Sequence, residues 1–235
     1  MFGSTEAFRT VAETGSTNDD LAALARAGAQ EGMWLRAERQ TAGKGRQGRA
    51  WTSPPGNLYA STLVRIRPGD PPAPSLALVS AVALHEAAES FAPEAPIRIK
   101  WPNDLVADGA KLAGILLERE GEAVIAGFGV NLAHHPTDTP RPATSLAVLA
   151  GGAPDPASFI ELLAQTFARW LEIWRSEGIS PVRAAWLAAA HPIGSALSTG
   201  EGEGLFDGLD ESGALRLRLA DGSARVIHAG DVFLI

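Results

Sequence analysis

A glycine-rich loop in the first quarter of the chain carries an unusual concentration of positive charge. The sequence RQTAGKGRQGRAW, residues 39–51, places Lys44, Arg46 and Arg49 among glycines. Residues 36–49 hold five Lys or Arg and one acid, whereas the whole chain has a net charge of −7. Glycine backbone amides and cationic side chains together bind anions such as phosphate. The loop therefore predicts a local anion site, and the alternative is a solvated basic surface loop.

Three familiar phosphate-binding loops do not fit this stretch. Gly43, Gly45 and Gly48 match the G-x-G-x-x-G of a dinucleotide-binding turn, but that turn must lead directly into a helix. Here AWTSPPGN follows, and Pro54 and Pro55 are incompatible with such a helix. The sequence also lacks the Ser or Thr of a Walker A loop and the partner motifs of a protein kinase. We expect a flexible loop between two strands that becomes ordered when an anion binds.

Four further stretches place polar or cationic side chains at the ends of predicted elements. GSTND (15–19) puts hydroxyls and an amide at a helix start, where free N–H groups point outward. KWPND (100–104) ends a strand, AKLAGILLE (110–118) brings a lysine close to a glycine, and GFGVNL (127–132) ends a glycine-containing strand. Taken singly, each stretch is explained equally well by a helix cap, a turn or a surface lysine.

Lysine and asparagine are scarce in this chain, and their placement is informative. All three lysines and three of the four asparagines fall in these stretches or in the glycine-rich loop: Lys44, Lys100, Lys111, Asn18, Asn103 and Asn131. The other 17 basic residues are arginines. Ammonium and guanidinium groups are not interchangeable, so lysines retained among so many arginines favour a function at these positions.

The hydrophobic pattern predicts an α+β fold with a mixed sheet flanked by helices. We expect strands at 8–15, 33–39, 57–66, 97–101, 116–120 and 123–132, helices at 18–27 and 75–91, and two helices after a Pro/Thr-rich loop at 133–145. From about Gly194, short strands separated by glycine-rich turns predict a small antiparallel β-barrel. This change from longer helices and strands to short strands and turns predicts two domains, residues 1–190 and 191–235. No residue of the second is assigned to a site.

Composition excludes several classes of protein. No apolar run approaches the roughly 18 residues of a membrane span, and the N-terminus lacks the pattern of a signal peptide. With no cysteine, disulfides and thiolate chemistry are excluded, which agrees with a cytoplasmic protein. The acidic net charge argues against a broad DNA-binding surface.

In their order and spacing, STND, RQTAGKGRQGRAW, KWPND, AKLAGILLE and GFGVNL resemble the biotin–protein ligases, and the resemblance covers essentially the whole chain. It implies a class II aminoacyl-tRNA-synthetase-like core of the biotin/lipoate ligase superfamily, followed by an SH3-like barrel. It also implies an ATP-dependent enzyme that makes biotinyl-5′-AMP with Mg²⁺ and transfers biotin to a lysine of a biotin carboxyl carrier protein. That carrier would belong to acetyl-CoA carboxylase or a related carboxylase. Bifunctional members carry an N-terminal DNA-binding domain. Because the first strand is expected near residue 8, we expect the monofunctional type.

The resemblance also implies which residues form the site. It gives catalytic roles to Lys111, Arg46 and Asp104. It places biotin against Ser16, Thr17, Asn18, Gln40, Gly43, Lys44, Gly45, Arg46, Lys111, Gly114 and Gly127. It places ATP against Arg46, Arg49, Trp51, Lys100, Asn103, Asp104, Lys111 and Asn131. Metal ligands are left open, because Asp104 is expected either to bind magnesium or to orient the incoming amine.

Within these sets the implied roles differ. Ser16, Thr17 and Gln40 would hold the ureido ring, Lys111 the carboxylate, and Trp51 the adenine face. Some relatives have arginine where this chain has Lys44, which keeps the positive charge but not the bidentate fork of N–H donors. The cations would reduce the repulsion between the biotin carboxylate and the ATP phosphates. Two unit charges about 4 Å apart repel by about 4 kcal/mol at an effective dielectric constant of 20.

Two other functions fit the sequence less well. A lipoate–protein ligase shares the architecture and the two-step chemistry, and a non-catalytic nucleic-acid-binding regulator could use the basic loop. The family includes both monomers and dimers formed through sheet edges, so a homodimer is possible for this chain, whereas no membrane or DNA partner is expected.

Overall fold

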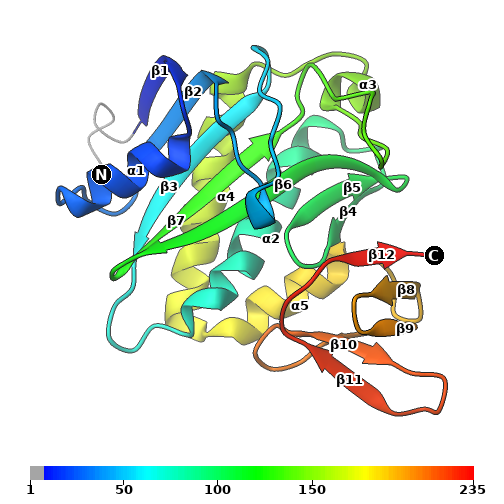
Figure 1. Cartoon of the computed structure of the whole chain (residues 1–235). Helices are drawn as coiled ribbons and strands as arrows, with labels where there is room; N and C mark the ends of the chain where they lie inside the picture. The colour runs from blue at the N-terminus through cyan, green and yellow to red at the C-terminus, as the bar shows by residue number, and fades with distance from the viewer. Residues whose placement is uncertain (1–7) are drawn as a thin grey trace.

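The computed structural model describes residues 8–235, and a seven-stranded sheet forms its centre (Figure 1). In chain order the strands are β1 (Phe8–Thr14), β2 (Trp34–Gln40), β3 (Leu58–Arg65), β4 (Ile97–Lys100), β5 (Asp104–Ala107), β6 (Ala110–Glu120) and β7 (Ala123–Val130). Their order across the sheet is β1-β2-β3-β7-β6-β5-β4. Strands β1 and β2 run parallel and the remaining pairs are antiparallel, which confirms the predicted α+β class with a mixed sheet.

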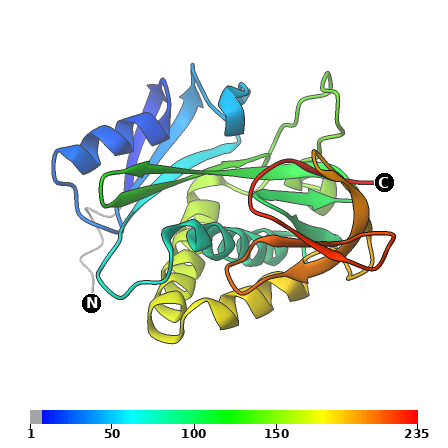
Figure 2. The ribbon, with the colours of Figure 1, turned by 60° about the horizontal axis from the view of Figure 1, so that its bottom comes forward.

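Helices cover both faces of this sheet. They are α1 (Thr17–Arg26), α2 (Leu76–Phe91), α3 (Leu146–Ala150), α4 (Pro156–Glu177) and α5 (Ile179–Ala189), with short 3₁₀ turns η1 (Arg46–Gly48) and η2 (Ala73–Ser75). In Figure 2, α1 lies above the sheet, and α2, α4 and α5 lie below it. No helix in the described part of the chain is long and apolar enough to cross a membrane.

The alternation of side chains along β7 explains why one face is packed and the other partly open. Val124, Ala126 and Phe128 point into the main core beneath α2 and α4. Ile125 points to the opposite face and packs with Leu21 of α1. Residues 127 and 129 follow on that opposite face, and both are glycines. Past the point where β7 packs against α1, this face of the strand therefore presents backbone and no side chains.

The start of α1 is determined by its local sequence. Ser16 is the N-cap, in extended conformation, and its side chain accepts a hydrogen bond from the backbone N–H of Asp19. Asp19 and Asp20 lie in the first turn and Arg26 in the last, an arrangement that the helix dipole favours. Thr17 and Asn18 are consequently held at the helix start, where both are buried.

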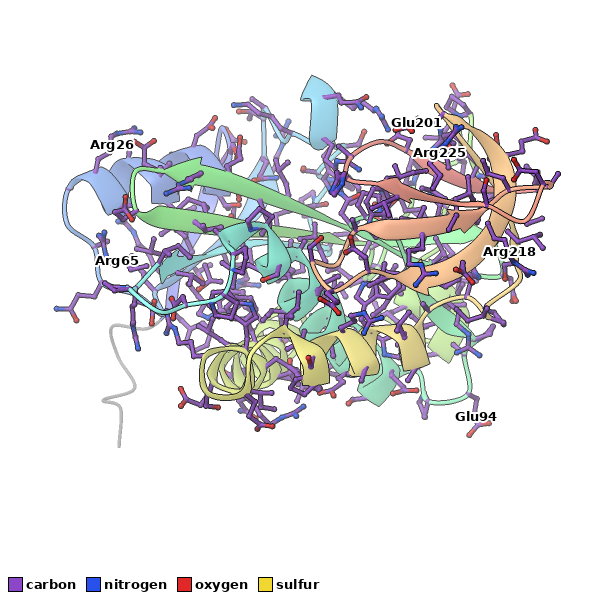
Figure 3. All side chains as sticks on the ribbon, turned by 90° about the horizontal axis from the view of Figure 1, so that it is seen from below. Arg26, Arg65, Glu94, Glu201, Arg218 and Arg225 are labelled. Atoms are coloured by element: carbon purple, nitrogen blue, oxygen red, sulfur yellow. The ribbon has the colours of Figure 1, made fainter. Side chains whose placement is uncertain are left out.

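The C-terminal strands form an open five-stranded sheet. They are β8 (Ala196–Thr199), β9 (Gly202–Leu209), β10 (Leu215–Arg218), β11 (Ala224–Ile227) and β12 (Val232–Leu234), in the order β11-β10-β9-β8-β12. The predicted closed barrel is therefore not confirmed: in the described chain, β11 and β12 are the two edges of the sheet and do not pair with each other. Charged side chains such as Glu201, Arg218 and Arg225 lie on this sheet, at the opposite end of the molecule from Arg26 (Figure 3).

The inner side of the C-terminal sheet is continuous with the main core. Phe206 of β9 packs edge-on against Trp186 of α5, with ring centroids 6.4 Å apart. The indole N–H of Trp101, which follows β4, donates to the backbone carbonyl of Gly213 at 3.3 Å. These contacts hold the C-terminal sheet beside the end of β4.

Two details of the predicted secondary structure were wrong. The segment at 107–114 was expected to hold a turn between strands at 97–101 and 116–120, but a separate strand, β5, precedes the turn and β6 begins already at Ala110. The helix α3 was not predicted. Both β5 and α3 are only four or five residues long, too short to show a hydrophobic period.

Candidate active site

A pocket of about 720 Å³ lies on the open part of the sheet face, beside the start of α1. All of the predicted site residues except Gly43 line it. They come from the α1 start, the glycine-rich loop, the β4–β5 hairpin and strands β6 and β7. Gly43 lies behind the wall, where an added Cβ would approach the backbone oxygen of Trp51 to 2.7 Å and Ser53 Oγ to 2.8 Å. Its smallness lets the loop fold closely against Ser53.

Glycines form the floor of the pocket. A Cβ at Gly127 would overlap the side chain of Asn18, and one at Gly129 would lie 2.6 Å from the Trp51 ring. At Gly114 it would lie 3.2 Å from Lys111 Nζ. The side chains of Asn18, Trp51 and Lys111 therefore occupy the space that larger residues at these three positions would fill.

Amide and hydroxyl groups gather at one end of the pocket. Gln40 Oε1 accepts hydrogen bonds from the backbone N–H of Thr17 at 2.8 Å and from its hydroxyl at 3.2 Å. Ser61 Oγ lies 2.7 Å from Thr17 Oγ1 and 2.6 Å from Asn18 Oδ1. Asn18 Nδ2 donates to Glu118 Oε2 at 2.7 Å. Sequence reasoning missed Ser61 and Glu118, because a serine inside a strand and a glutamate near a strand end give no signal of a site.

Cationic groups gather at the other end. Lys111 Nζ lies 2.8 Å from Asp104 Oδ1, and Lys100 Nζ lies 3.9 Å from Asp104 Oδ2. Burial lowers the pKa of Lys100, and the nearby Asp104 carboxylate opposes this effect. Arg46 donates to Asn103 Oδ1 at 3.3 Å, which joins the glycine-rich loop to the β4–β5 hairpin. The Asp104 carboxylate thus faces two lysines with Arg46 nearby, an excess of positive charge that attracts anions.

Trp51 covers the glycine floor between these two ends. Lys111 Nζ lies 5.3 Å from the centre of its ring, within the range of a cation–π contact. Its indole nitrogen is buried and has no hydrogen-bond partner among the described residues. Buried donors normally find a partner, so this N–H is a donor that the described protein leaves unsatisfied.

The remaining predicted residues are engaged differently. Lys44 lines the pocket, but its ammonium lies 2.6 Å from Asp19 Oδ2 on α1, and this hydrogen bond raises the pKa of Lys44. The Asn131 side chain donates to the carbonyl of Thr144 at 3.0 Å and so holds the end of β7 against the loop at 133–145. In this arrangement both side chains already have protein partners.

Part of the pocket lining comes from segments where no site was expected. Arg141 lies in the Pro/Thr-rich loop, and Asp231 and Phe233 lie in or next to β12. Phe233 is flanked by Arg141, 3.8 Å from the ring centre, and by Lys100, 5.6 Å away. Asp231 forms ion pairs with Arg49 and Arg46. The short sequence DVFL predicts only a strand, so no local signal could have identified these residues.

Family models match both parts of the chain. Residues 14–132 match the "Biotin/lipoate A/B protein ligase family", and residues 196–235 match the "Biotin protein ligase C terminal domain". The chain belongs to the biotin/lipoate A/B protein ligase family.

Individual proteins show how close the similarity is. The chain is 41% identical to a biotin–[acetyl-CoA-carboxylase] ligase of Paracoccus denitrificans, over 95% of this chain and 98% of that protein. It is 34% identical to the bifunctional ligase/repressor BirA of Bacillus subtilis, over 91% of this chain and 70% of that protein. The structure of a biotin protein ligase from Aquifex aeolicus in complex with biotin and ATP superimposes with a TM-score of 0.87, at 26% identity, over 98% of this chain and 100% of that one.

Proposed function

We propose that this protein is a biotin–protein ligase that activates biotin with ATP and transfers it to a lysine of a biotin carboxyl carrier protein. The observation that carries the proposal is the composition of the pocket. One end is made of matched amide and hydroxyl groups, and the other is made of cations from separate segments. A ligand with a neutral polar ring and a carboxylate suits such a pocket, and so does a polyphosphate bound beside that carboxylate.

In this proposal the ureido ring of biotin lies at the end formed by Ser16, Thr17 and Gln40. Its carbonyl accepts a hydrogen bond, and its two N–H groups need acceptors such as the Gln40 or Asn18 amide oxygens. The glycine floor at Gly114 and Gly127 accommodates the flat ring system. The biotin carboxylate then points toward Lys111, where the ammonium offsets its negative charge.

The first step joins two anions. A carboxylate oxygen of biotin attacks the α-phosphorus of ATP, the bond from that phosphorus to the β-phosphate bridging oxygen breaks, and pyrophosphate leaves. Lys111, Arg46, Arg49 and Lys100 lower the repulsion between the reactants and stabilise the charge on the transferring phosphoryl group. Asn103, which accepts from Arg46, positions that guanidinium.

The second step transfers the biotinyl group. The ε-amine of the acceptor lysine attacks the acyl carbon, the bond to the phosphate oxygen breaks, and AMP leaves with its electron pair. The attacking amine loses a proton, and Asp104 is the carboxylate placed to orient it or to accept that proton. Lys111 faces the acyl-phosphate oxygen in both steps.

Magnesium is proposed as a companion of ATP. Among the described residues there is no cluster of three His, Cys, Asp or Glu side chains that could hold a metal. Magnesium usually keeps several waters and phosphate oxygens and needs only one or two carboxylates. Asp104 lines the pocket and fits that requirement, and the ion would supply charge neutralisation at the phosphates.

Incorporation of label tests this function directly. Purified protein is incubated with ATP, magnesium and a carboxylase carrier domain, with either labelled biotin or labelled lipoate. We expect biotin to be incorporated and pyrophosphate to be released, and we expect no label on a carrier whose acceptor lysine is replaced by arginine. Preferential incorporation of lipoate would identify the alternative ligase. If biotin produced no pyrophosphate at all, the ligase reaction itself would be excluded.

The structure favours biotin over the two alternatives considered. The dithiolane ring of lipoate has no strong hydrogen-bond donor or acceptor, so it would leave the Thr17, Gln40 and Asn18 groups unmatched. A nucleic-acid-binding regulator would present its cations on an extended face, whereas Arg46, Lys100 and Lys111 line a pocket. We place the reaction in the cytoplasm, where ATP is available.

Arg46 is proposed to close the loop over the reactive adenylate. Replacing Arg46 by glycine removes its contacts to Asn103 and to the carbonyl of Gly230, so biotinyl-5′-AMP should dissociate faster. We expect bystander lysines of an unrelated protein to become labelled in the presence of the variant. The measurement is the release rate of labelled adenylate from the enzyme on a desalting column. A release rate equal to that of the parent would contradict the lid role.

The domain boundaries and the oligomeric state are also proposals. We propose a catalytic domain at 1–190 and a small C-terminal domain at 191–235 with strands arranged as in an SH3-like fold. Limited proteolysis that cuts near residue 191 would support this division. A homodimer would use the free edge of the seven-stranded sheet at β1, and light scattering with and without biotin measures it.

A further inference from the structure

The carboxylate of Asp231 contacts two arginines of the glycine-rich loop. Its Oδ2 pairs closely with Arg49 Nη2, and its Oδ1 lies 3.7 Å from Arg46 Nη1. The adjacent carbonyl of Gly230 accepts hydrogen bonds from Arg46 Nη1 at 3.2 Å and from Nη2 at 3.3 Å. The loop is therefore attached to the segment just before β12, which is more than 180 positions away in the chain.

These contacts are better shielded than ordinary surface ion pairs. The Arg46 and Asp231 side chains are 25% and 26% exposed, whereas the Arg49 side chain is 51% exposed. Burial alone would raise the pKa of Asp231, but the hydrogen bond from Arg49 and the charges of Arg49 and Arg46 outweigh it and hold the pKa below its usual range. Asp231 is thus an ionised carboxylate at neutral pH.

The position of this carboxylate is unexpected for a nucleotide pocket. Arg46 and Arg49 are the loop cations assigned to ATP, and a fixed negative charge beside them repels phosphate. A guanidinium group presents the same fork of N–H donors to a carboxylate and to a phosphate. Asp231 therefore occupies donors that ATP phosphates need.

We propose that Asp231 is the counter-ion of Arg46 and Arg49 in the nucleotide-free protein, and that the phosphates of ATP displace it. The inference rests on the proposed function for the identity of the displacing anion. Asp231 acts through the arginines, so it is a positioning residue. It keeps the loop folded against the C-terminal sheet before ATP arrives, and it weakens ATP binding because one anion must be exchanged for another.

Displacement also connects the loop to the C-terminal strand. Phe233 lies two residues after Asp231 and contacts both Arg141 and Lys100. When Arg46 and Arg49 turn to the nucleotide, the segment at 230–234 loses its contacts to the loop and keeps those to Arg141 and Lys100. ATP binding is thereby transmitted to β12.

The first test measures affinity for a non-hydrolysable ATP analogue by calorimetry, using the full chain. Asp231→Asn removes the competing charge at nearly constant volume, and we expect it to bind the analogue about three- to tenfold more tightly, as two partly exposed ion pairs allow. Asp231→Glu keeps the charge and should resemble the parent. Asp207→Asn is the matched control, because Asp207 lies on the same sheet but pairs with Arg216.

The second test does not require ATP. Trypsin cleaves after Lys and Arg, so it reports the accessibility of the loop at 43–49 in the ligand-free protein. We expect cleavage there to be several-fold faster in Asp231→Asn than in the parent, Asp231→Glu or Asp207→Asn. The analogue should protect parent and variant alike.

The outcomes are separable. Equal or weaker binding of the analogue by Asp231→Asn would overturn the counter-ion role, because a carboxylate that merely preorganises the arginines should help ATP. Unchanged cleavage of the loop would overturn it too. If the parent bound neither the analogue nor biotin, the proposed function would fail instead, and the cleavage rates alone would decide the role of Asp231.

Discussion

Lys111 Nζ lies 2.8 Å from Asp104 Oδ1, and the two residues belong to neighbouring antiparallel strands. The register pairs Asp104 with Gly114 and Val106 with Lys111, with an irregularity between Leu105 and Val106. That irregularity and the bare glycine let the lysine reach along the strand to the carboxylate. Asp104 thereby holds the ammonium in the pocket before any substrate is present.

The pair predicts unequal losses of activity. Lys111→Ala removes a cation from the site of reaction and should lower kcat for adenylate formation by about 10²- to 10³-fold. Asp104→Asn keeps the Lys111 ammonium but removes the carboxylate that holds it in position, and it should lower kcat by about 10- to 100-fold. Biotin-dependent pyrophosphate release measures both. Asp108→Asn, in the exposed turn between the same strands, is the control and should behave like the parent.

The glycine floor predicts that a single methyl group will damage the site. Gly129→Ala places a Cβ about where the Trp51 ring lies, so Trp51 must move off the floor. We expect the KM for ATP to rise at least about tenfold and the free energy of unfolding to fall by about 1–3 kcal/mol. Gly152→Ala meets no atom within 4 Å and should change neither quantity. Normal KM values for both substrates in Gly129→Ala would show that Trp51 is not needed there.

A buried ion pair far from the pocket predicts a large effect on stability. Arg175 of α4 donates to both carboxylate oxygens of Glu31, at 2.7 and 2.8 Å, and to the carbonyl of Arg65 at 3.0 Å. Arg175→Met leaves Glu31 with only the more exposed Arg67 as a cationic partner and removes the Arg175 contact of Asp70. It should lower the free energy of unfolding by about 2–3 kcal/mol, discounted because the pair is not fully buried. Urea denaturation measures it. Arg169 also lies on α4 and forms a more exposed ion pair with Glu86 of α2, so Arg169→Met should change stability by less than about 1 kcal/mol.

The same pair predicts a dependence on pH. Burial would raise the pKa of Glu31, but the hydrogen bonds from Arg175 and Arg65 and the charges of Arg175 and Arg67 outweigh it and lower the pKa. A lowered carboxyl pKa stabilises the folded state above its usual value of 4.5, and this stabilisation is lost as the pH falls below that value. The stability difference between parent and Arg175→Met should therefore shrink in acid.

His191 predicts a second acid-sensitive contribution. Burial lowers its pKa, and the positive charges of Lys100 and Arg98 lower it further, so the folded state favours the neutral ring. The unfolded chain binds a proton below the usual value of 6.5, and stability should fall as the pH drops through it. Between about pH 7.5 and about pH 5.5, melting temperature should decrease less in His191→Gln than in the parent. His228→Gln replaces an exposed histidine and should retain the parent's slope.

Much of the fold was predictable because its causes are local. Pro54 and Pro55 exclude a helix after the glycine-rich loop, and the structure has none before β3. Ser16 caps α1 by accepting a hydrogen bond from the backbone N–H three residues later. The alternation of side chains along β7 shows which residues face the core. Such signals depend on backbone propensity and period within a few residues.

The sequence indicated which segments line the pocket but not the geometry of their side chains. The sequence alone indicated which segments carry cations and amides, and the structure brings those segments to one pocket. It could not indicate that Lys44 turns to Asp19, or that Ser61 and Glu118 complete the amide cluster. Side-chain direction depends on which partners lie near after folding.

Only the tertiary structure decided the role of the C-terminal sheet. Whether five strands close into a barrel depends on pairing between the two edge strands of the sheet, and the edges β11 and β12 do not pair with each other. Asp231 meets Arg49 across 182 positions of sequence, through contacts that packing of β12 against the core makes possible. The amino-acid sequence by itself determined the helices and strands and the chemical groups that they carry. Long-range packing decided which charges meet, because no local propensity acts over that separation.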